Sequence, residues 1–188
     1  MKVKLSDIAN IQFGFYTKPT EEGNAVYLQA KHFDEAGIQS EQIDTFIQID
    51  NKSEIHLLED GDILLVGKGM RNFAWTYSKT YGVAIASSIF FVIKPNKNKV
   101  IPEFLTTLFN LQQTQVNFQT LGAGSSIPSI RKSELEAFTF ELPSLALHQK
   151  IIAIKQLHYK DIELSKMIIS EKGTVYQAVI QNIINKAS

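Results

Sequence analysis

The sequence has 188 residues, of which 44% are hydrophobic and 20% are charged. This composition is typical of a folded protein, and the length suits one or two domains with a substantial core. The apolar runs are far shorter than the roughly 20 residues that cross a bilayer, and no apolar signal core follows the first methionine. The absence of cysteine excludes disulfides, thiolate metal sites and cysteine nucleophiles. We therefore expect a cytoplasmic protein without a membrane segment.

The net charge is zero, because 19 basic residues balance 19 acidic ones, but the charges are distributed unevenly along the chain. Residues 21–62 carry eleven acidic residues and two lysines, a net charge of −9. Residues 63–132 carry eight basic residues and one glutamate, a net charge of +7. A basic segment of this kind can form a positive surface that attracts phosphate groups. The alternative is that the acidic and basic segments face and neutralise one another.

The part of the chain before residue 145 predicts a mixed α/β domain. Short apolar or β-branched runs separated by turn residues indicate strands. A helix is predicted from Pro102, because proline suits the first helical turn, and a second, short helix is predicted from Ser129 or Ser133. The predicted strands comprise residues 11–16, 25–30, 45–49, 63–66, 73–77, 83–93 and 137–142.

The composition changes after Pro143, since residues 145–186 contain no proline and a single glycine, Gly173. Apolar residues recur there at helical spacing, and about 40 residues would form a helix about 60 Å long. One long helix or a kinked pair is favoured over two helices broken at residues 171–173, because a glycine inside a helix costs only about 1 kcal/mol. An apolar stripe needs a partner, and interrupting polar residues favour a bundle over a strict coiled coil. The stripe includes Ile162, Ile169, Tyr176 and Ile183, spaced seven apart.

Motifs for catalysis are absent from the sequence. It has no phosphate-binding loop or dinucleotide-binding glycine motif, and its four histidines lack metal-ligand spacing. We therefore predict a protein that is not an enzyme and has no cofactor and no metal site. Two alternatives remain open. One is a metal-dependent nuclease that uses Asp60, Asp62 and Lys68, and the other is a helical protein–protein adaptor without a nucleic acid partner.

Two segments rich in basic and polar residues are candidates for contacts with DNA. Residues 68–79 combine three cations with three aromatic residues and an asparagine, and residues 122–132 form a hydroxyl-rich segment with two cations. Arginine and asparagine can bond base edges, while lysine and hydroxyl groups suit phosphate oxygens. The predicted DNA-binding residues are Lys68, Arg71, Asn72, Tyr77, Ser78, Lys79, Ser125, Ser126, Arg131 and Lys132.

The predicted roles differ within this set. Lys68, Lys79 and Lys132 are expected to contact phosphates, and Arg71 and Asn72 to contact base edges. If this assignment is right, the cations of both segments should converge on one concave face.

Each segment also has a purely structural interpretation. Residues 68–79 could form a β-hairpin whose aromatic side chains are core and whose cations are solvated, and Trp75 is expected in the core in either case. Residues 122–132 could be a plain loop that ends in a helix cap.

Several short motifs, in order along the chain, resemble the specificity subunits of Type I restriction–modification enzymes. The DGDILL sequence at 60–65 resembles the entry to a strand of their target recognition domains, and VIPEFL at 100–105 resembles a helix start. LPSLALHQKIIA at 142–153 resembles the signature that opens the family's long helix, although Ser144 and His148 replace a common proline and glutamate. Weaker matches occur at residues 122–126, 129, 132–135 and 138–142.

The resemblance implies a non-catalytic subunit that recognises DNA. Residues 1–143 would be a target recognition domain for one half of a bipartite site, and residues 144–188 a helical spacer and dimerisation segment. The implied partners are double-stranded DNA, methyltransferase (modification) subunits and a restriction subunit. A full specificity subunit has two recognition domains and two spacers, so we expect a half subunit that forms a homodimer and recognises a split palindrome.

Overall fold

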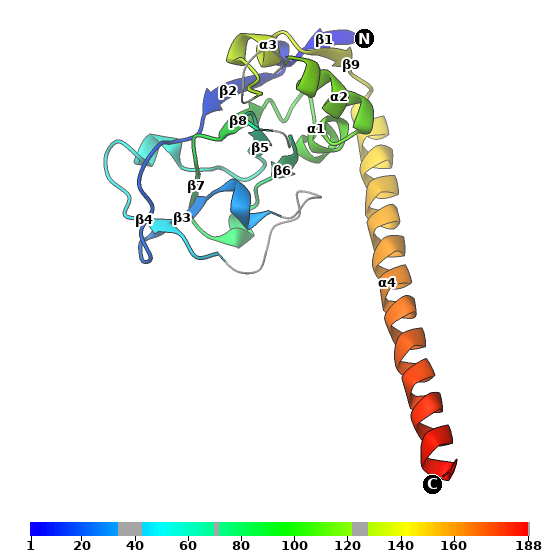
Figure 1. The fold of residues 1–188 in the computed structure, drawn as a ribbon. Helices are drawn as coiled ribbons and strands as arrows, with labels where there is room; N and C mark the ends of the chain where they lie inside the picture. The colour runs from blue at the N-terminus through cyan, green and yellow to red at the C-terminus, as the bar shows by residue number, and fades with distance from the viewer. Residues whose placement is uncertain (34–42, 70–71, 122–127, 188) are drawn as a thin grey trace. The chain divides into compact units, whose positions relative to one another are not determined.

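The computed structural model describes residues 1–33, 43–69, 72–121 and 128–187. The chain divides into two compact units, Met1–Gln149 and Lys150–Ser188. The first unit contains strands and helices, and the second continues a long helix, α4 (Leu145–Ala187) (Figure 1). This confirms the predicted fold class, an α/β domain followed by a long C-terminal helix. Gly173 lies inside α4, so the first of the two favoured predictions, one long helix, is confirmed.

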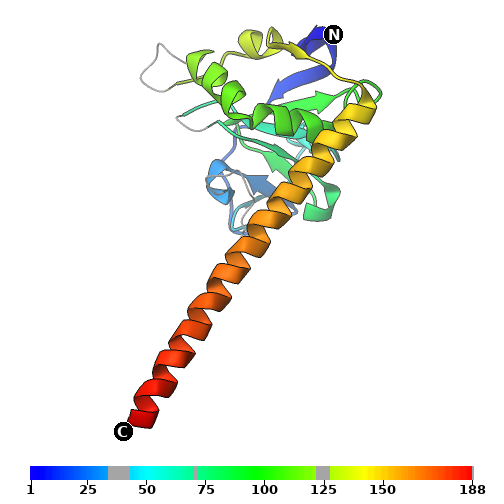
Figure 2. The ribbon, with the colours of Figure 1, turned by 90° about the vertical axis from the view of Figure 1, so that its right-hand side faces the viewer.

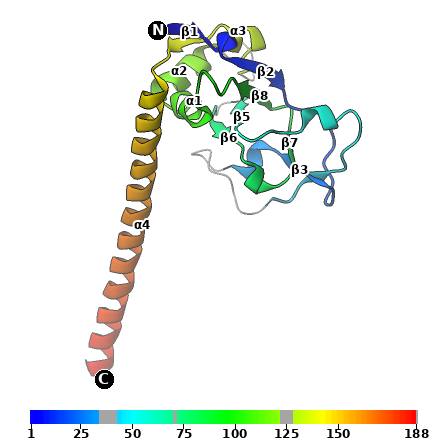
Figure 3. The ribbon, with the colours of Figure 1, turned by 180° about the vertical axis from the view of Figure 1, so that it is seen from behind.

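The largest sheet of the first unit is antiparallel, with four strands in the order β2-β8-β5-β6 (Figure 3). Its central strands are apolar on both faces, as expected for strands buried on both sides. Strand β8 pairs with β2 on one side and with β5 on the other. The four strands are β2 (Ala9–Phe13), β8 (Phe90–Pro95), β5 (Ile63–Val66) and β6 (Ala74–Thr76).

Two smaller sheets contain the other strands in the described part of this unit. One has the order β4-β3-β7, in which β3 pairs antiparallel with β4 and parallel with β7. The other joins the N-terminal strand β1 to β9, near the end of the unit. These strands are β1 (Lys2–Lys4), β3 (Ala25–Leu28), β4 (Phe46–Ile47), β7 (Ala84–Ala86) and β9 (Thr139–Glu141).

The prediction of one strand over residues 83–93 is wrong. The run contains two strands, β7 and β8, which belong to different sheets. A turn separates them, in which the N–H of Phe90 donates to the carbonyl oxygen of Ser87 at 3.0 Å. The chain thus passes from the three-stranded sheet to the four-stranded sheet within a continuous apolar sequence.

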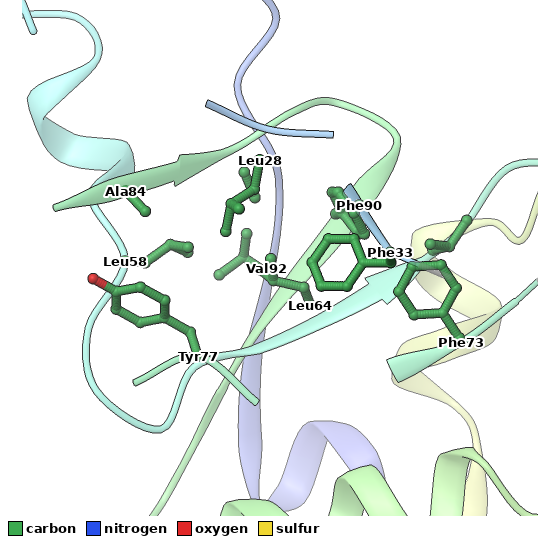
Figure 4. Close-up of a cluster of buried hydrophobic side chains, with 11 residues drawn as sticks. Leu28, Phe33, Leu58, Leu64, Phe73, Tyr77, Ala84, Phe90 and Val92 are labelled. Atoms are coloured by element: carbon green, nitrogen blue, oxygen red, sulfur yellow. The ribbon is translucent and has the colours of Figure 1, made fainter. Parts of the chain in front are cut away.

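One hydrophobic core lies between the two larger sheets, because its side chains come from β3, β5, β7 and β8. Figure 4 shows Phe33, Phe73 and Phe90 gathered at one end of this core and Tyr77 at the other. The ring centroids of Phe33 and Phe73 lie 5.1 Å apart, a distance typical of stabilising aromatic pairs. Trp75 packs against this core, as predicted.

In the described part of the first unit, three α-helices precede α4: α1 (Pro102–Phe109), α2 (Gln112–Leu121) and α3 (Lys132–Glu136). Figure 2 shows α1 and α2, in green, following one another along one side of the strands. The side-chain amide of Asn110 donates to the carbonyl oxygen of Ala74 and accepts its N–H, both at 2.8 Å. Asn110 therefore replaces a neighbouring strand at the edge of β6 and satisfies both backbone groups.

The first turn of α4 is part of the first unit, and His148 lies there with no exposed surface. Its ring stacks on Phe104 of α1 with the centroids 3.9 Å apart. Neither ring nitrogen has a hydrogen-bond partner among the described residues. Burial lowers the pKa of His148, so the neutral imidazole serves here as an aromatic packing group.

Replacing His148 by phenylalanine is therefore expected to stabilise the protein. Removing two unsatisfied buried nitrogens should raise the free energy of unfolding by about 1 kcal/mol at neutral pH. The gain should be larger at pH 5, because unfolded histidine takes up a proton below about pH 6.5 while the buried ring resists it. Chemical denaturation at both pH values measures this, with the exposed His158→Phe as control. A lower stability of His148→Phe at pH 5 would contradict this role.

The second unit consists of helix alone, and every side chain from residue 156 to residue 186 is exposed. Many of these exposed side chains are large and apolar, including Leu157, Ile169 and Ile183. No helix in the described part of the chain is long and apolar enough to span a membrane.

Candidate nucleic-acid interface

A pocket of about 350 Å³ lies at one end of the four-stranded sheet. The C-terminal end of β5, the start of β8 and the end of β2 meet there with the segment that precedes α3. The floor is apolar and aromatic, whereas three predicted DNA-binding cations and two serines line the rim. The lining residues are Phe13, Gly67, Lys68, Ser88, Ile89, Phe90, Phe91, Ser129, Ile130, Arg131 and Lys132.

A short β-bridge between Lys68 and Ser129 joins the two segments that carry the cations. The N–H of Ile130 donates to the carbonyl oxygen of Gly67 at 2.9 Å, and that of Gly69 donates to Pro128 at 2.8 Å. These bonds hold the backbone before α3 alongside the end of β5. Residues about 60 positions apart in the sequence are thereby fixed on the same pocket.

The absence of a side chain at Gly67 shapes the floor of the pocket. A Cβ atom at this position would lie 2.4 Å from Cε2 of Phe91, far closer than two carbon atoms approach in proteins. The Phe91 ring therefore occupies the space that any other residue at position 67 would fill. This contact fixes the ring against the end of β5.

The three cations of the pocket are accessible to a ligand. Lys68 is exposed and makes no ion pair within the described residues. Arg131 lies 3.9 Å from Glu134 and Lys132 lies 3.5 Å from Glu136, both pairs along α3. Exposed pairs of this kind contribute only about 0–1 kcal/mol, so a phosphate group can compete with the carboxylates.

Three acidic residues, Glu59, Asp60 and Asp62, lie at the opposite end of the sheet, where lysines bond to them. Lys94, at the end of β8, lies 2.8 Å from Glu59 and 3.3 Å from Asp62. Burial raises the pKa of Asp62, while hydrogen bonding to Lys94 lowers the pKa of Glu59. The ammonium of Lys97 donates to the carbonyl oxygen of Asp60. The acidic and basic segments therefore do face one another here, whereas the cations at the pocket stay exposed.

The residues of the nuclease alternative do not come together. Asp60 and Asp62 precede β5 and Lys68 follows it, so the four residues of the strand, about 13 Å, separate them. The carboxylate of Asp62 also accepts the N–H of Glu59 at 2.9 Å, as expected for a turn residue. Across the described parts of the chain, no three histidine or acidic side chains gather into a group that could hold a metal ion.

The predicted candidates within 72–79 do not line the pocket. The amide of Asn72 is buried and donates to the carbonyl oxygen of Val66 at 2.8 Å. The hydroxyl of Tyr77 donates to Gly82 inside the domain, with the ring in the core. Ser78 caps the short helix Lys79–Tyr81.

Lys79 does not converge with the other cations, contrary to the prediction. Its N–H donates to Asp60 at 3.1 Å, at the acidic end of the sheet. The reason is the hairpin, because β6 runs antiparallel to β5 and carries the chain back past the start of β5. Arg71, Ser125 and Ser126 lie outside the described residues.

The pocket also contains residues that the sequence did not single out. Phe13, Ser88 and Ser129 line it although they are not in the predicted set. Ser129 lies within the hydroxyl-rich segment 122–132, so the composition of that segment already pointed to it. For Phe13 the sequence shows only an aromatic residue directly before Gly14 in a predicted strand, which by itself does not indicate a binding site.

A second polar cluster surrounds the buried residue His32. Its Nδ1 accepts a backbone N–H at 3.1 Å, while its Nε2 lies 3.0 Å from Asp44 and 3.1 Å from Thr45. Hydrogen bonds from Lys31 and His32 lower the pKa of Asp44 to about 2. A catalytic triad needs the acid and the nucleophile on opposite ring nitrogens. In this cluster the carboxylate of Asp44 and the hydroxyl of Thr45 both lie on Nε2, so a triad is not formed. The cluster instead links the backbone near His32 to the backbone near Asp44.

Several solved structures share the fold of this chain, including the following three. A chain of a type I R-M system assembly matches with a TM-score of 0.64 and 16% identity, over 100% of this chain and 45% of that one. The HsdS subunit from Thermoanaerobacter tengcongensis matches with a TM-score of 0.64 and 14% identity, over 88% and 39% of the two chains. The Type-I restriction-modification system S subunit from M. genitalium matches with a TM-score of 0.57 and 15% identity, over 87% and 40%. This chain thus spans less than half the length of each.

No curated protein matches the sequence significantly. The family described as the Type I restriction modification DNA specificity domain matches residues 1–171. This match covers the α/β unit and more than half of α4. The chain therefore belongs to the Type I restriction modification DNA specificity domain family.

Proposed function

We propose that this chain is a non-catalytic subunit of a Type I restriction–modification system that recognises one half of a bipartite DNA site. Residues 1–143 would form the target recognition domain, and residues 144–188 the helical spacer and dimerisation segment. The observation that carries the proposal is the convergence of Lys68, Arg131 and Lys132 on one pocket. Cations grouped around a concavity are suited to phosphate oxygens of a DNA backbone.

The proposed roles follow from these positions. Lys68, Arg131 and Lys132 contact phosphates and fix the orientation of the duplex. Arg71, Ser125 and Ser126 remain proposed DNA contacts, with Arg71 on a base edge. Ser78 and Lys79 could contact DNA only at the other end of the sheet, and the bonds of Asn72 and Tyr77 within the domain give both a structural role.

The proposed partners are duplex DNA, methyltransferase subunits and a restriction subunit, and the proposed location is the cytoplasm. The exposed apolar helix of the second unit supports a helical partner, because such a surface is unfavourable in water. We assign this partner as a second copy of the chain, which would produce inverted, identical half-sites. The proposal needs no cofactor and no metal.

Co-expression with the methyltransferase subunits tests this function. We expect methylation of a single split palindrome, mapped across the host genome by sequencing, that depends on this chain. The Lys68→Gln/Arg131→Gln variant should lose methylation, whereas the exposed control Lys18→Gln/Lys52→Gln should keep it. Unchanged methylation without the chain would contradict the proposal. Metal-dependent cleavage by the purified chain would favour the nuclease alternative, and failure to bind any duplex at low salt would favour the adaptor.

A further inference from the structure

One aromatic side chain of the pocket is exposed. Phe13, the last residue of β2, is 50% exposed although it lines the pocket. It lies opposite Phe91 in the register of β2 and β8, and the two ring centroids are 5.1 Å apart. Phe90 and Phe91 are almost completely buried. Phe13 is therefore the aromatic residue of the pocket that has surface to offer a ligand.

The position of this ring is well supported. Phe91, behind it, is held by its close packing on Gly67, where no other residue leaves room for the ring. Pairing of β2 with β8 fixes the backbone of Phe13. A supported apolar group needs little ordering when it binds a ligand, which favours its use in recognition.

A ligand of this pocket must combine negative charge with an apolar group. Duplex DNA presents both, because phosphates flank the major groove and the C5-methyl group of thymine is exposed inside it. The other groups that the bases expose in this groove are hydrogen-bond donors and acceptors, which an aromatic ring does not satisfy. If the cations of the pocket bind phosphates, the exposed ring of Phe13 is the aromatic group of the pocket that remains available to a base edge.

We infer that Phe13 is a specificity-determining residue that contacts the C5-methyl group of a thymine in the target, with Phe91 supporting it. This inference rests on the proposed function and deepens it. It assigns one base preference to a side chain of β2, outside the two segments that carry the cations.

The test uses the full-length chain and duplexes selected by it from a random library. Each thymine of the selected sequence is replaced singly by deoxyuridine, which removes only the methyl group. We expect one thymine per half-site at which the replacement weakens binding about fourfold, the value that burial of one methyl group implies. Phe13→Ala should weaken binding to the thymine duplex by at least this factor and remove the difference between thymine and uracil. Phe13→Leu, which keeps an apolar contact, should retain most of the difference.

Tyr81→Ala is the matched control, because Tyr81 is 46% exposed and packs on Trp75 with centroids 5.0 Å apart at the opposite end of the sheet. It should leave both affinities unchanged. The inference is overturned if replacement by uracil leaves the affinity unchanged at every position. It is also overturned if Phe13→Ala weakens binding to thymine and uracil duplexes equally, the result expected for a ring inserted between bases. Failure to select any sequence would instead refute the proposed function itself.

Discussion

Replacing Lys68, Arg131 and Lys132 together by glutamine is expected to remove most of the electrostatic affinity for DNA. Each phosphate contact contributes about 0.9 to the slope of log affinity against log salt, so the slope should decrease in magnitude by nearly three. The ratio of the wild-type affinity for DNA to the variant's affinity should then decrease about 40-fold between 50 and 200 mM salt. Titrations of labelled duplex followed by fluorescence anisotropy, at several salt concentrations, measure both quantities.

The appropriate control removes the same charge elsewhere. Lys2, Lys18 and Lys52 are exposed and do not line the pocket, so the triple glutamine variant at these positions should keep nearly the full slope. All substituted side chains are on the surface, and both variants should keep the melting temperature of the wild type. Equal changes of slope in both variants would mean that the general charge of the protein, and not the pocket, attracts DNA.

The sequence predicts individual strands better than it predicts the sheets that contain them. Strand β5 is recognisable because four apolar residues lie between turn residues, the pattern of a strand buried on both faces. Residues 83–93 show the same kind of pattern but contain two strands of different sheets. Both strands are buried, so hydrophobicity does not mark the change, and only Ser87 and Ser88 interrupt the apolar run.

The candidate site was predictable in composition but not in geometry. Lys68 and Lys132 line the same pocket because a β-bridge between Lys68 and Ser129 joins two distant segments, and no local sequence pattern indicates this bridge. Lys79 is only eleven positions from Lys68, yet it lies at the far end of β5 because the hairpin reverses the chain. Tyr77 and Asn72 have the residue types of DNA-binding positions, but long-range packing makes them part of the domain interior.

Polar substitutions in the stripe of α4 are expected to separate the proposed homodimer. Ile162, Ile169 and Ile183 are exposed and spaced so that they lie on one face of the helix. At 1.5 Å per residue, the stripe from Ile162 to Ile183 is about 30 Å long. Pairing two such stripes would bury six isoleucines, each of which favours association by about 1.5–3 kcal/mol when it is fully covered.

The triple variant Ile162→Gln/Ile169→Gln/Ile183→Gln should therefore be monomeric at micromolar concentration, while the wild type is a dimer. Light scattering coupled to size-exclusion chromatography measures the mass directly. Lys160→Gln/Glu163→Gln, on the opposite face of α4, should stay dimeric. The triple isoleucine variant should also lose most of its affinity for a complete palindrome, because the link between two α/β units is broken. It should bind a single half-site as the wild type does, because the α/β unit itself is unchanged. A wild-type chain that is itself monomeric at these concentrations would refute self-pairing and would assign the stripe to a helix of another subunit.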